Sequence, residues 1–354
     1  MTVVNPDQTI TDEINSLQSR ISDLQESVRL TKVRDALEDL QSNVNGMSAR
    51  LTTLRTRGYV FEKDLESQVK AITDAWALLS PNVQSQMEQQ ASLLMSSLRP
   101  IELQMPQLAA AAANPTIASG LLRTLQTAVG QVESGVSAAE NAIDGMYNQF
   151  GSQVNTLSKH LDEINYLLTQ LSEASFQLLP TEAGIAAVKA VWCKTGKEQK
   201  GDPAGILYLT DQRLLFEEKE EVATRKVLFI TTEKEKKQGL QLEAPVVLVE
   251  KVETSKQGLL KNEDHVEVHF SSGAPITTAD FHIWQENTIW QTLINRARSK
   301  DFDTGRAVAI DQAAVAKAKA APSQCPNCGG IINRVVLRGQ DNLTCEYCGF
   351  VIRL

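Results

Sequence analysis

Cys325-Pro326-Asn327-Cys328-Gly329 and Cys345-Glu346-Tyr347-Cys348-Gly349 are two C-x-x-C-G segments near the end of the chain. A C-x-x-C turn places two thiolates on one side of a tight turn. The glycine after each second cysteine permits a positive φ, so that backbone N–H groups can turn toward the sulfurs. Two such turns facing each other complete a tetrahedron of sulfur. The spacing therefore predicts a four-thiolate metal site made by Cys325, Cys328, Cys345 and Cys348.

Residues 322–354 as a whole resemble a zinc ribbon. The sequence predicts a strand over 331–337, a turn over 339–342 and a closing strand over 349–352. The resemblance implies one structural Zn²⁺ per chain, because a site closed by four thiolates has no open position for water or substrate. Disulfide bonds are the alternative. We favour zinc because the sequence shows no secretory signal and the motif suits a reducing compartment.

The composition predicts a multidomain protein of 354 residues with two or three domains. Its net charge of -8 argues against a chain that binds polyanions as a whole, and most of the acidic excess lies in residues 1–180. No stretch is apolar over a length that would span a bilayer. We therefore expect a cytoplasmic protein, with peripheral membrane association as an alternative.

Residues 1–180 are predicted to be helical, because their apolar residues recur at alternating spacings of three and four. The register slips between Val28 and Val33, and Gly58 to Phe61 interrupt the pattern. Ser80-Pro81 predicts a helix start, and Pro100 and Pro106 predict its end. Residues 100–115 are then expected to form a connector before a long helix that begins near Thr116.

These helices carry narrow apolar stripes that another helix must cover. Two alternatives are open: an antiparallel intramolecular bundle, or an oligomeric coiled-coil rod in which a second copy covers the stripes. We assign this region to no family.

From about residue 183 the apolar period changes from 3.6 to 2, which predicts strands. The expected strands are 185–192, 206–210, 213–218, 226–232, 245–252, 265–270 and 279–283, followed by a helix over 286–297. Seven strands and one C-terminal helix predict a strongly bent sheet plugged by that helix. The fold class is therefore α+β.

The hairpin from Gly205 to Phe216 resembles that of GRAM and bacterial pleckstrin-homology-like domains, and the resemblance covers about residues 181–300. Trp290 occupies the place of the tryptophan in the helix of that fold. The resemblance implies a domain that binds lipid headgroups or proteins and is not an enzyme. We expect Trp290, with Ile289, Leu293 and Ile294 beside it, to pack against the sheet. The sheet residues expected opposite it are Val188, Leu207, Leu209, Leu215 and Val268.

Lysines in the hairpin loops could form a site for a lipid headgroup. These lysines are Lys194, Lys197, Lys200, Lys234, Lys236 and Lys237. Glutamates are interspersed with them, so a solvated, self-neutralised surface is the simpler interpretation. Binding of a protein partner then becomes the favoured function of this domain.

The remaining candidate residues have simpler structural explanations. His160 is expected on a helix surface. His265 and His269 share a strand face and could form a metal pair, but we favour a structural role for both. Cys193 is expected to be a buried small residue. Residues 301–322 form an Ala-rich linker, partly helical.

The sequence thus predicts four parts: a helical region (1–180), a pleckstrin-homology-like domain (181–300), the linker (301–322) and the ribbon (323–354). We expect a non-enzymatic scaffold or adaptor that oligomerises through its helices and binds protein partners. The alternatives are a peripheral membrane-associated protein that binds lipid headgroups and a nucleic-acid-associated regulator that acts through the zinc ribbon. Nothing in the sequence supplies a reacting group or a small-molecule site.

Overall fold

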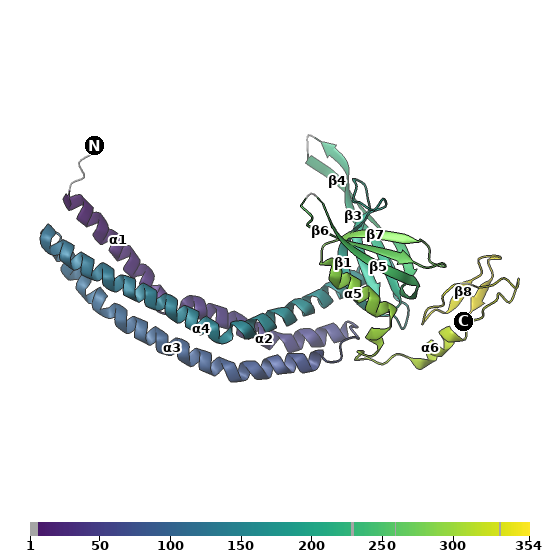
Figure 1. The fold of residues 1–354 in the computed structure, drawn as a ribbon, viewed down its shortest axis with the longest axis horizontal. Helices are drawn as coiled ribbons and strands as arrows, with labels where there is room; N and C mark the ends of the chain where they lie inside the picture. The colour runs from purple at the N-terminus through teal and green to yellow at the C-terminus, as the bar shows by residue number, and fades with distance from the viewer. Residues whose placement is uncertain (1–5, 228–229, 259, 333) are drawn as a thin grey trace. The chain divides into compact units, whose positions relative to one another are not determined.

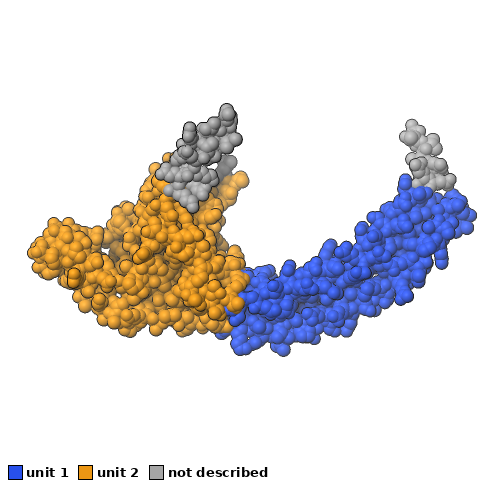
Figure 2. Space-filling model, turned by 180° about the vertical axis from the view of Figure 1, so that it is seen from behind, with its two compact units in different colours: residues 1–48, 67–158 blue, residues 49–66, 159–354 orange. Residues whose placement is uncertain are grey.

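The computed structural model describes residues 6–227, 230–258, 260–332 and 334–354. These residues form two compact units, one of residues 1–48 and 67–158 and the other of residues 49–66 and 159–354 (Figure 2). The multidomain α+β class is confirmed, since long helices come first and a seven-stranded sheet follows. None of the helices among the described residues combines the length and the apolar character needed to cross a membrane.

The first half of the chain forms four helices: α1 (Pro6–Ser27), α2 (Thr31–Thr56), α3 (Leu65–Ala111) and α4 (Pro115–Ser172). The predicted slip after Val28 is a real break, where Leu30 takes a φ of 54° while its side chain is fully buried. The interruption after Gly58 is also confirmed, because it lies between α2 and α3.

The predicted connector over 100–115 is wrong. Helix α3 continues through Pro81, Pro100 and Pro106, and only residues 112–114 separate it from α4. An interior proline costs a helix about 3 kcal/mol. Burial of each leucine or methionine side chain contributes about 1.5–3 kcal/mol to stability. Helix α3 keeps an unbroken buried stripe across all three prolines. That stripe is formed by Trp76, Val83, Met87, Leu94, Leu98, Ile101, Met105 and Leu108.

In the first unit the apolar stripes face one another within a single chain. The Trp76 ring on α3 stacks on Phe150 of α4 at 5.4 Å, and its Nε1 donates to Gln41 of α2 at 2.6 Å. Arg20 of α1 forms an ion pair with Glu133 of α4 at 2.7 Å. The stripes are thus covered as the intramolecular alternative requires. Buried members include Leu17, Ile21, Leu24, Val44, Val69, Leu122, Leu125, Val129, Val136, Ile143 and Val154.

The second unit contains one antiparallel sheet with the order β4-β3-β2-β1-β7-β6-β5. Helix α5 (Asn287–Arg298) follows the last strand and lies against the sheet (Figure 1). Seven antiparallel strands followed by one helix are the arrangement predicted from the sequence. The strands are β1 (Gly184–Trp192), β2 (Ala204–Thr210), β3 (Arg213–Val227), β4 (Ile230–Pro245), β5 (Val249–Gln257), β6 (Glu263–Phe270) and β7 (Thr278–Ile283).

Seven strands were expected, but two boundaries are wrong. The predicted strand 226–232 does not stand alone, because β3 ends at Val227 and β4, which pairs with it, begins at Ile230. Residues 228–229 lie outside the described residues. Residues 246–248 are a 3-10 turn, so the fifth strand starts at Val249 and not at Pro245. The side chains of Lys234 and Lys236 lie outside the described residues.

Trp290 is fully buried, as predicted, and its Nε1 donates to Gln285 at 2.7 Å. Two of its expected neighbours are wrong. Ile289 is exposed on the outer face of α5. Leu215 pairs with Tyr208 across β2 and β3 and packs with it on the other face of the sheet, against Leu171.

Sterics explain why residue 205, at the start of the hairpin motif, is a glycine. A Cβ at this position would lie 1.9 Å from the backbone oxygen of Glu217. The register between β3 and β4 also shifts between Phe216 and Glu217. Strand β3 therefore approaches β2 more closely than a side chain at position 205 would allow.

The linker and ribbon hold helix α6 (Gln312–Lys319) and a two-stranded sheet of β8 (Asn342–Thr344) and β9 (Val351–Arg353) (Figure 1). The strand predicted over 331–337 is wrong, since the described residues there form only one bridge, from Gln324 to Ile331. Part of the linker is packed, because Phe302 is buried against Phe61 with ring centroids 5.6 Å apart.

Candidate metal centre

The four ribbon cysteines come together as the sequence predicts. Cys325 Sγ lies 3.7 Å from Cys348 Sγ, and Cys328 Sγ lies 3.7 Å from Cys345 Sγ. All four sulfurs lie within 4.8 Å of one another. None of the four forms a disulfide bond. A tetrahedral ion with metal–sulfur bonds of about 2.3 Å would place its sulfurs about 3.8 Å apart, so the cluster has the size needed to hold a metal ion.

Two matching backbone turns position the sulfurs. The N–H of Gly329 donates to Cys325 O and that of Gly349 donates to Cys345 O, each at 2.9 Å. Gly329 and Gly349 have φ values of 68° and 70°, which is the left-handed conformation predicted for both. The local symmetry of the two turns directs both pairs of thiols to one point.

Each turn contributes one buried and one exposed sulfur ligand. Cys325 and Cys345 are buried and pack with Leu343 and Ile352 in a small apolar cluster. Cys328 and Cys348 are exposed. The backbone N–H of Phe350, followed by the side chains of Asn327 and Cys328, lowers the pKa of Cys348 to about 6. Against the lowering effect of the Gly330 backbone N–H, the neighbouring thiols, Cys348 first, instead raise the pKa of Cys328 to about 12. The cluster therefore contains one thiol that ionises readily, and the thiolate is the form that binds a metal.

The donor set indicates a structural site. Four thiolates are typical of zinc and of iron–sulfur centres, and the four sulfurs have the spacing of a tetrahedral site for one ion. The apolar cluster holding Leu343 and Ile352 is small, so a bound ion would supply much of the ribbon's folding free energy.

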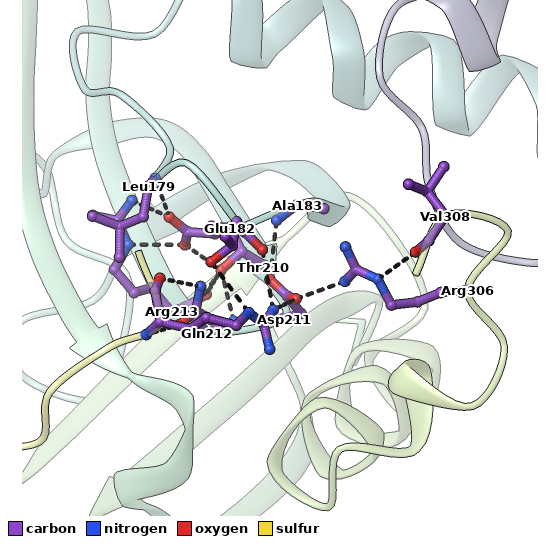
Figure 3. Close-up of polar contacts among 11 residues, drawn as sticks. Leu179, Glu182, Ala183, Thr210, Asp211, Gln212, Arg213, Arg306 and Val308 are labelled. Carbon is purple, nitrogen blue, oxygen red and sulfur yellow. Dashed lines mark hydrogen bonds and ion pairs between the residues drawn. The ribbon is translucent and has the colours of Figure 1, made fainter. Parts of the chain in front are cut away.

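A buried polar network surrounds the turn between β2 and β3, which sequence reasoning described only as a turn (Figure 3). Asp211 Oδ1 accepts from the N–H of Ala183 at 3.0 Å, and Oδ2 accepts from Arg306 at 2.8 Å and from Arg338. The Asp211 side chain is 3% exposed. Three segments far apart in sequence thus converge on one carboxylate.

Arg213, in the same hairpin as Asp211, is also buried and forms ion pairs. Its guanidinium contacts both carboxylate oxygens of Glu182, at 2.9 and 2.5 Å, and Glu243 at 2.8 Å. The hydroxyl of Thr210 donates to Glu182 at 2.5 Å. Because two buried charges are costly unless fully paired, this network specifies where the segment before β1 must lie. No pattern in the sequence links Glu182 to Arg213.

The ribbon contacts the sheet domain through Arg338. Its backbone N–H donates to Gln212 Oε1 at 2.6 Å, and Gln212 Nε2 donates back to Arg338 O at 3.0 Å. Its guanidinium also contacts Thr181. Arg338 is one of three arginines in the ribbon sequence, and nothing in that sequence identifies its partner.

Many of the lysines on the sheet face carboxylates. Lys219 pairs with Glu173 at 2.7 Å and Lys256 with Asp264 at 2.7 Å. Lys237 pairs with Glu218. Lys194 lies 3.5 Å from the centre of the Trp192 ring. Of the six loop lysines considered as a headgroup site, Lys237 is thus paired with a carboxylate and Lys194 lies on an aromatic ring.

The histidines have contact partners that the sequence did not identify. His160 is not simply a surface residue, because its Nε2 lies 2.6 Å from Glu62, and Glu163 and Glu62 raise the pKa of His160 to about 9. His265 does not pair with His269. It is buried, stacks on His282 of β7 and contacts Asp280. Strand pairing decides these neighbours, and the sequence contained no signal for it. Cys193 is buried, as expected.

Comparison with known proteins identifies no family for this chain. No family model matches it, and no curated protein matches it. Among solved structures, one similar chain is described as the crystal structure of the DH/PH domains of p115-RhoGEF. That match has 13% identity and a TM-score of 0.23, and it covers 84% of this chain and 95% of the other.

Proposed function

We propose that this protein is a non-enzymatic adaptor that binds protein partners through its pleckstrin-homology-like domain and ribbon and self-associates through its helices. The ribbon would hold one structural Zn²⁺ through Cys325, Cys328, Cys345 and Cys348. The observation that carries the proposal is the pairing of basic side chains with carboxylates on both domains. This pairing lowers the free positive charge that a lipid headgroup or a nucleic acid would need.

The ribbon supports protein binding over nucleic-acid binding. Arg334 forms an ion pair with Glu346 at 2.6 Å, and Arg338 is engaged by Asp211. Two of the ribbon's three arginines, counted in the sequence, are therefore occupied within the chain. Phosphate contacts need several basic groups that are free to release counterions, so these arginines are poor candidates for that task.

A groove of about 230 Å³ offers a place for a protein segment. It is lined by residues of the sheet domain, the linker and the ribbon, all in the second unit. Apolar Val247, Val315 and Val336 share it with Arg298 and Asp303. A mixed apolar and charged lining suits a short peptide with one or two apolar anchors.

An exposed leucine stripe on α3 supports self-association. Leu78, Leu93 and Leu103 are 78%, 61% and 67% exposed. At 3.6 residues per turn they lie within about 80° of one another around the helix. Exposed leucines aligned on one face are the kind of surface that a second chain covers.

Sedimentation of the full chain tests this self-association. We expect concentration-dependent dimers or larger species, and we expect the triple variant Leu78→Glu, Leu93→Glu, Leu103→Glu to sediment as a monomer with unchanged helicity. Met146→Glu, on α4, is the control and should behave as wild type. A wild-type protein that stays monomeric at all concentrations would show that this part of the proposal is wrong.

Two binding assays test the choice of partner. The full chain should not float with vesicles that contain anionic or phosphoinositide lipids, and it should bind neither DNA nor RNA in a salt titration. Flotation that is lost in the variant Lys194→Glu, Lys197→Glu, Lys200→Glu would instead support the lipid alternative. Nucleic-acid binding with a steep salt dependence would support the regulator alternative.

A further inference from the structure

His265 is a buried histidine with one ring nitrogen left over. The residue is 1% exposed, and its Nδ1 lies 2.8 Å from Asp280 Oδ1. Because a carboxylate accepts, Nδ1 carries the proton and Nε2 presents a lone pair. Within the described part of the chain that Nε2 is buried without a hydrogen-bond partner. Such an atom is uncommon in a folded protein and requires an explanation.

His282 repeats the same arrangement on the next strand. It lies directly opposite His265 in the pairing of β6 with β7, and the two rings stack with centroids 5.2 Å apart. Its Nδ1 lies 2.5 Å from Glu198. Both histidines therefore direct Nδ1 to a carboxylate, which leaves Nε2 as the ring nitrogen that could bind a metal. This carboxylate–histidine arrangement is the one that orients metal-binding histidines.

Glu263 supplies a third donor at the same place. It lies two residues before His265 on β6 and so shares its face of the strand. Its Oε2 is 4.0 Å from His265 Nε2. The donor atoms of Glu263, His265 and His282 lie within 4.8 Å of one another. Two imidazoles and one carboxylate form a ligand set that zinc accepts with one position open.

Two of the three residues, Glu263 and His282, line an open groove of about 680 Å³ together with Lys256 and Trp284, and His265 is buried behind them. Trp284 stacks on the His282 ring at 4.3 Å and covers its outer side. A metal held here would thus be reached from solvent through the groove, unlike one closed in by four thiolates.

Cys193 and Asp280 also lie near His265, but their contacts suit them less well as ligands. Cys193 Sγ faces the carbonyl of Val191 at 3.7 Å, and burial raises the pKa of this thiol to about 12. Asp280 is already used to hold Nδ1 of His265. The ligand set that remains is Glu263, His265 and His282.

We propose that Glu263, His265 and His282 bind a divalent transition-metal ion of the zinc class, separately from the ribbon cysteines and with one coordination position open to the groove. Asp280 and Glu198 act as positioning residues, because each holds the Nδ1 proton of one histidine ligand.

A zinc titration of the full chain followed by calorimetry and elemental analysis tests the site. The wild type should bind one more Zn²⁺ than Glu263→Gln or His282→Ala. The Glu263 side chain is 38% exposed, so its conversion to glutamine should leave the fold intact. Asp280→Asn should weaken binding by about 10–100-fold, the usual effect of removing a carboxylate behind a histidine ligand. Near-ultraviolet circular dichroism checks that each variant is folded.

His269→Gln is the matched control. His269 lies on the same strand but contacts Glu253 at 3.1 Å, so its loss should leave the stoichiometry unchanged. Side-chain ¹⁵N spectra give an independent readout, because Zn²⁺ should shift the Nε2 signals of His265 and His282 and not those of His269. The proposal is overturned if the wild type binds no ion beyond the ribbon's, if Glu263→Gln and His282→Ala both retain it, or if His269→Gln loses it. These outcomes concern the histidine cluster alone and leave the adaptor proposal untouched.

Discussion

The guanidinium of Arg338, in the ribbon, donates to the carboxylate of Asp211, in the turn between β2 and β3. The same carboxylate oxygen, Oδ2, also accepts a hydrogen bond from Arg306 of the linker at 2.8 Å. Burial raises the pKa of Asp211, while the backbone N–H of Ala183 and the two arginines lower it. One short turn therefore holds the linker and the ribbon against the sheet domain.

Removal of this carboxylate should be costly. Asp211→Ala leaves the buried guanidiniums of Arg306 and Arg338 without their shared partner, and breaking a buried pair in this way costs about 3–5 kcal/mol. We expect that loss in the free energy of unfolding of the second unit, measured by urea denaturation. Asp341→Ala, whose side chain is 79% exposed, is the control and should change stability little. Equal stabilities for the two variants would contradict the network.

Arg338→Ala should release the ribbon without unfolding it. The four cysteines are elsewhere in the ribbon, so metal content should stay at the wild-type level. The hydrogen bonds of Arg338 to Gln212 and Thr181 would be weakened or lost. Hydrogen exchange should therefore accelerate at the amide of residue 338 and around Ala183. Arg334→Ala, which affects an exposed ion pair, should not have this effect.

Cys325→Ser and Cys345→Ser should each remove the metal from the ribbon. Binding of a structural zinc contributes about 10 kcal/mol or more to modules of this kind, so the ribbon should also lose its fold. Elemental analysis and protease sensitivity near residues 323–354 are the measurements. Cys193→Ser is the control, since Cys193 lies in the sheet domain. Full retention of zinc in both ribbon variants would refute the assignment.

Trp290→Ala should destabilise the sheet domain by about 3–5 kcal/mol, because it empties the site of a fully buried aromatic side chain. The expected result is a sharply lower melting temperature or insoluble protein. Trp284 is 58% exposed, so Trp284→Ala should melt near the wild-type temperature. Normal stability of Trp290→Ala with lost partner binding would mean that the residue is a contact and not a core residue.

His160 should make stability depend on pH. Its pKa rises to about 9 in the folded protein, first through Glu163 and then through Glu62, and an unfolded histidine titrates near about 6.5. The stabilisation is therefore complete below about pH 6.5 and is lost as the pH rises through about 9. The side chain is 37% exposed, which limits the effect to about 1 kcal/mol.

His160→Gln is the variant that tests this dependence. The wild type should lose its advantage over the variant between pH 6.5 and 9, in urea denaturation series at several pH values. A constant difference across that range would exclude the titration of His160 as its cause.

The elements that could be predicted from the sequence are those that depend on local chemistry. The cysteine pairs with their glycines specify two identical turns, because positive φ and thiol spacing act within five residues. The heptad pattern specified the helices and the break after Val28. The period-two pattern specified most of the strands and a closing helix with Trp290 in the core, because alternation reports which face is buried.

Features that depend on contacts between distant segments could be found only in the folded protein. Helix α3 passes through Pro100 and Pro106 because its buried stripe outweighs the local cost. Leu215 lies on the far face because β2 and β3 pair it with Tyr208. Asp211 and Arg338 meet across 127 residues, and His265 faces His282 rather than His269 because register sets cross-strand partners. Register and ion pairing are properties of two segments together, and neither segment's sequence carries them alone.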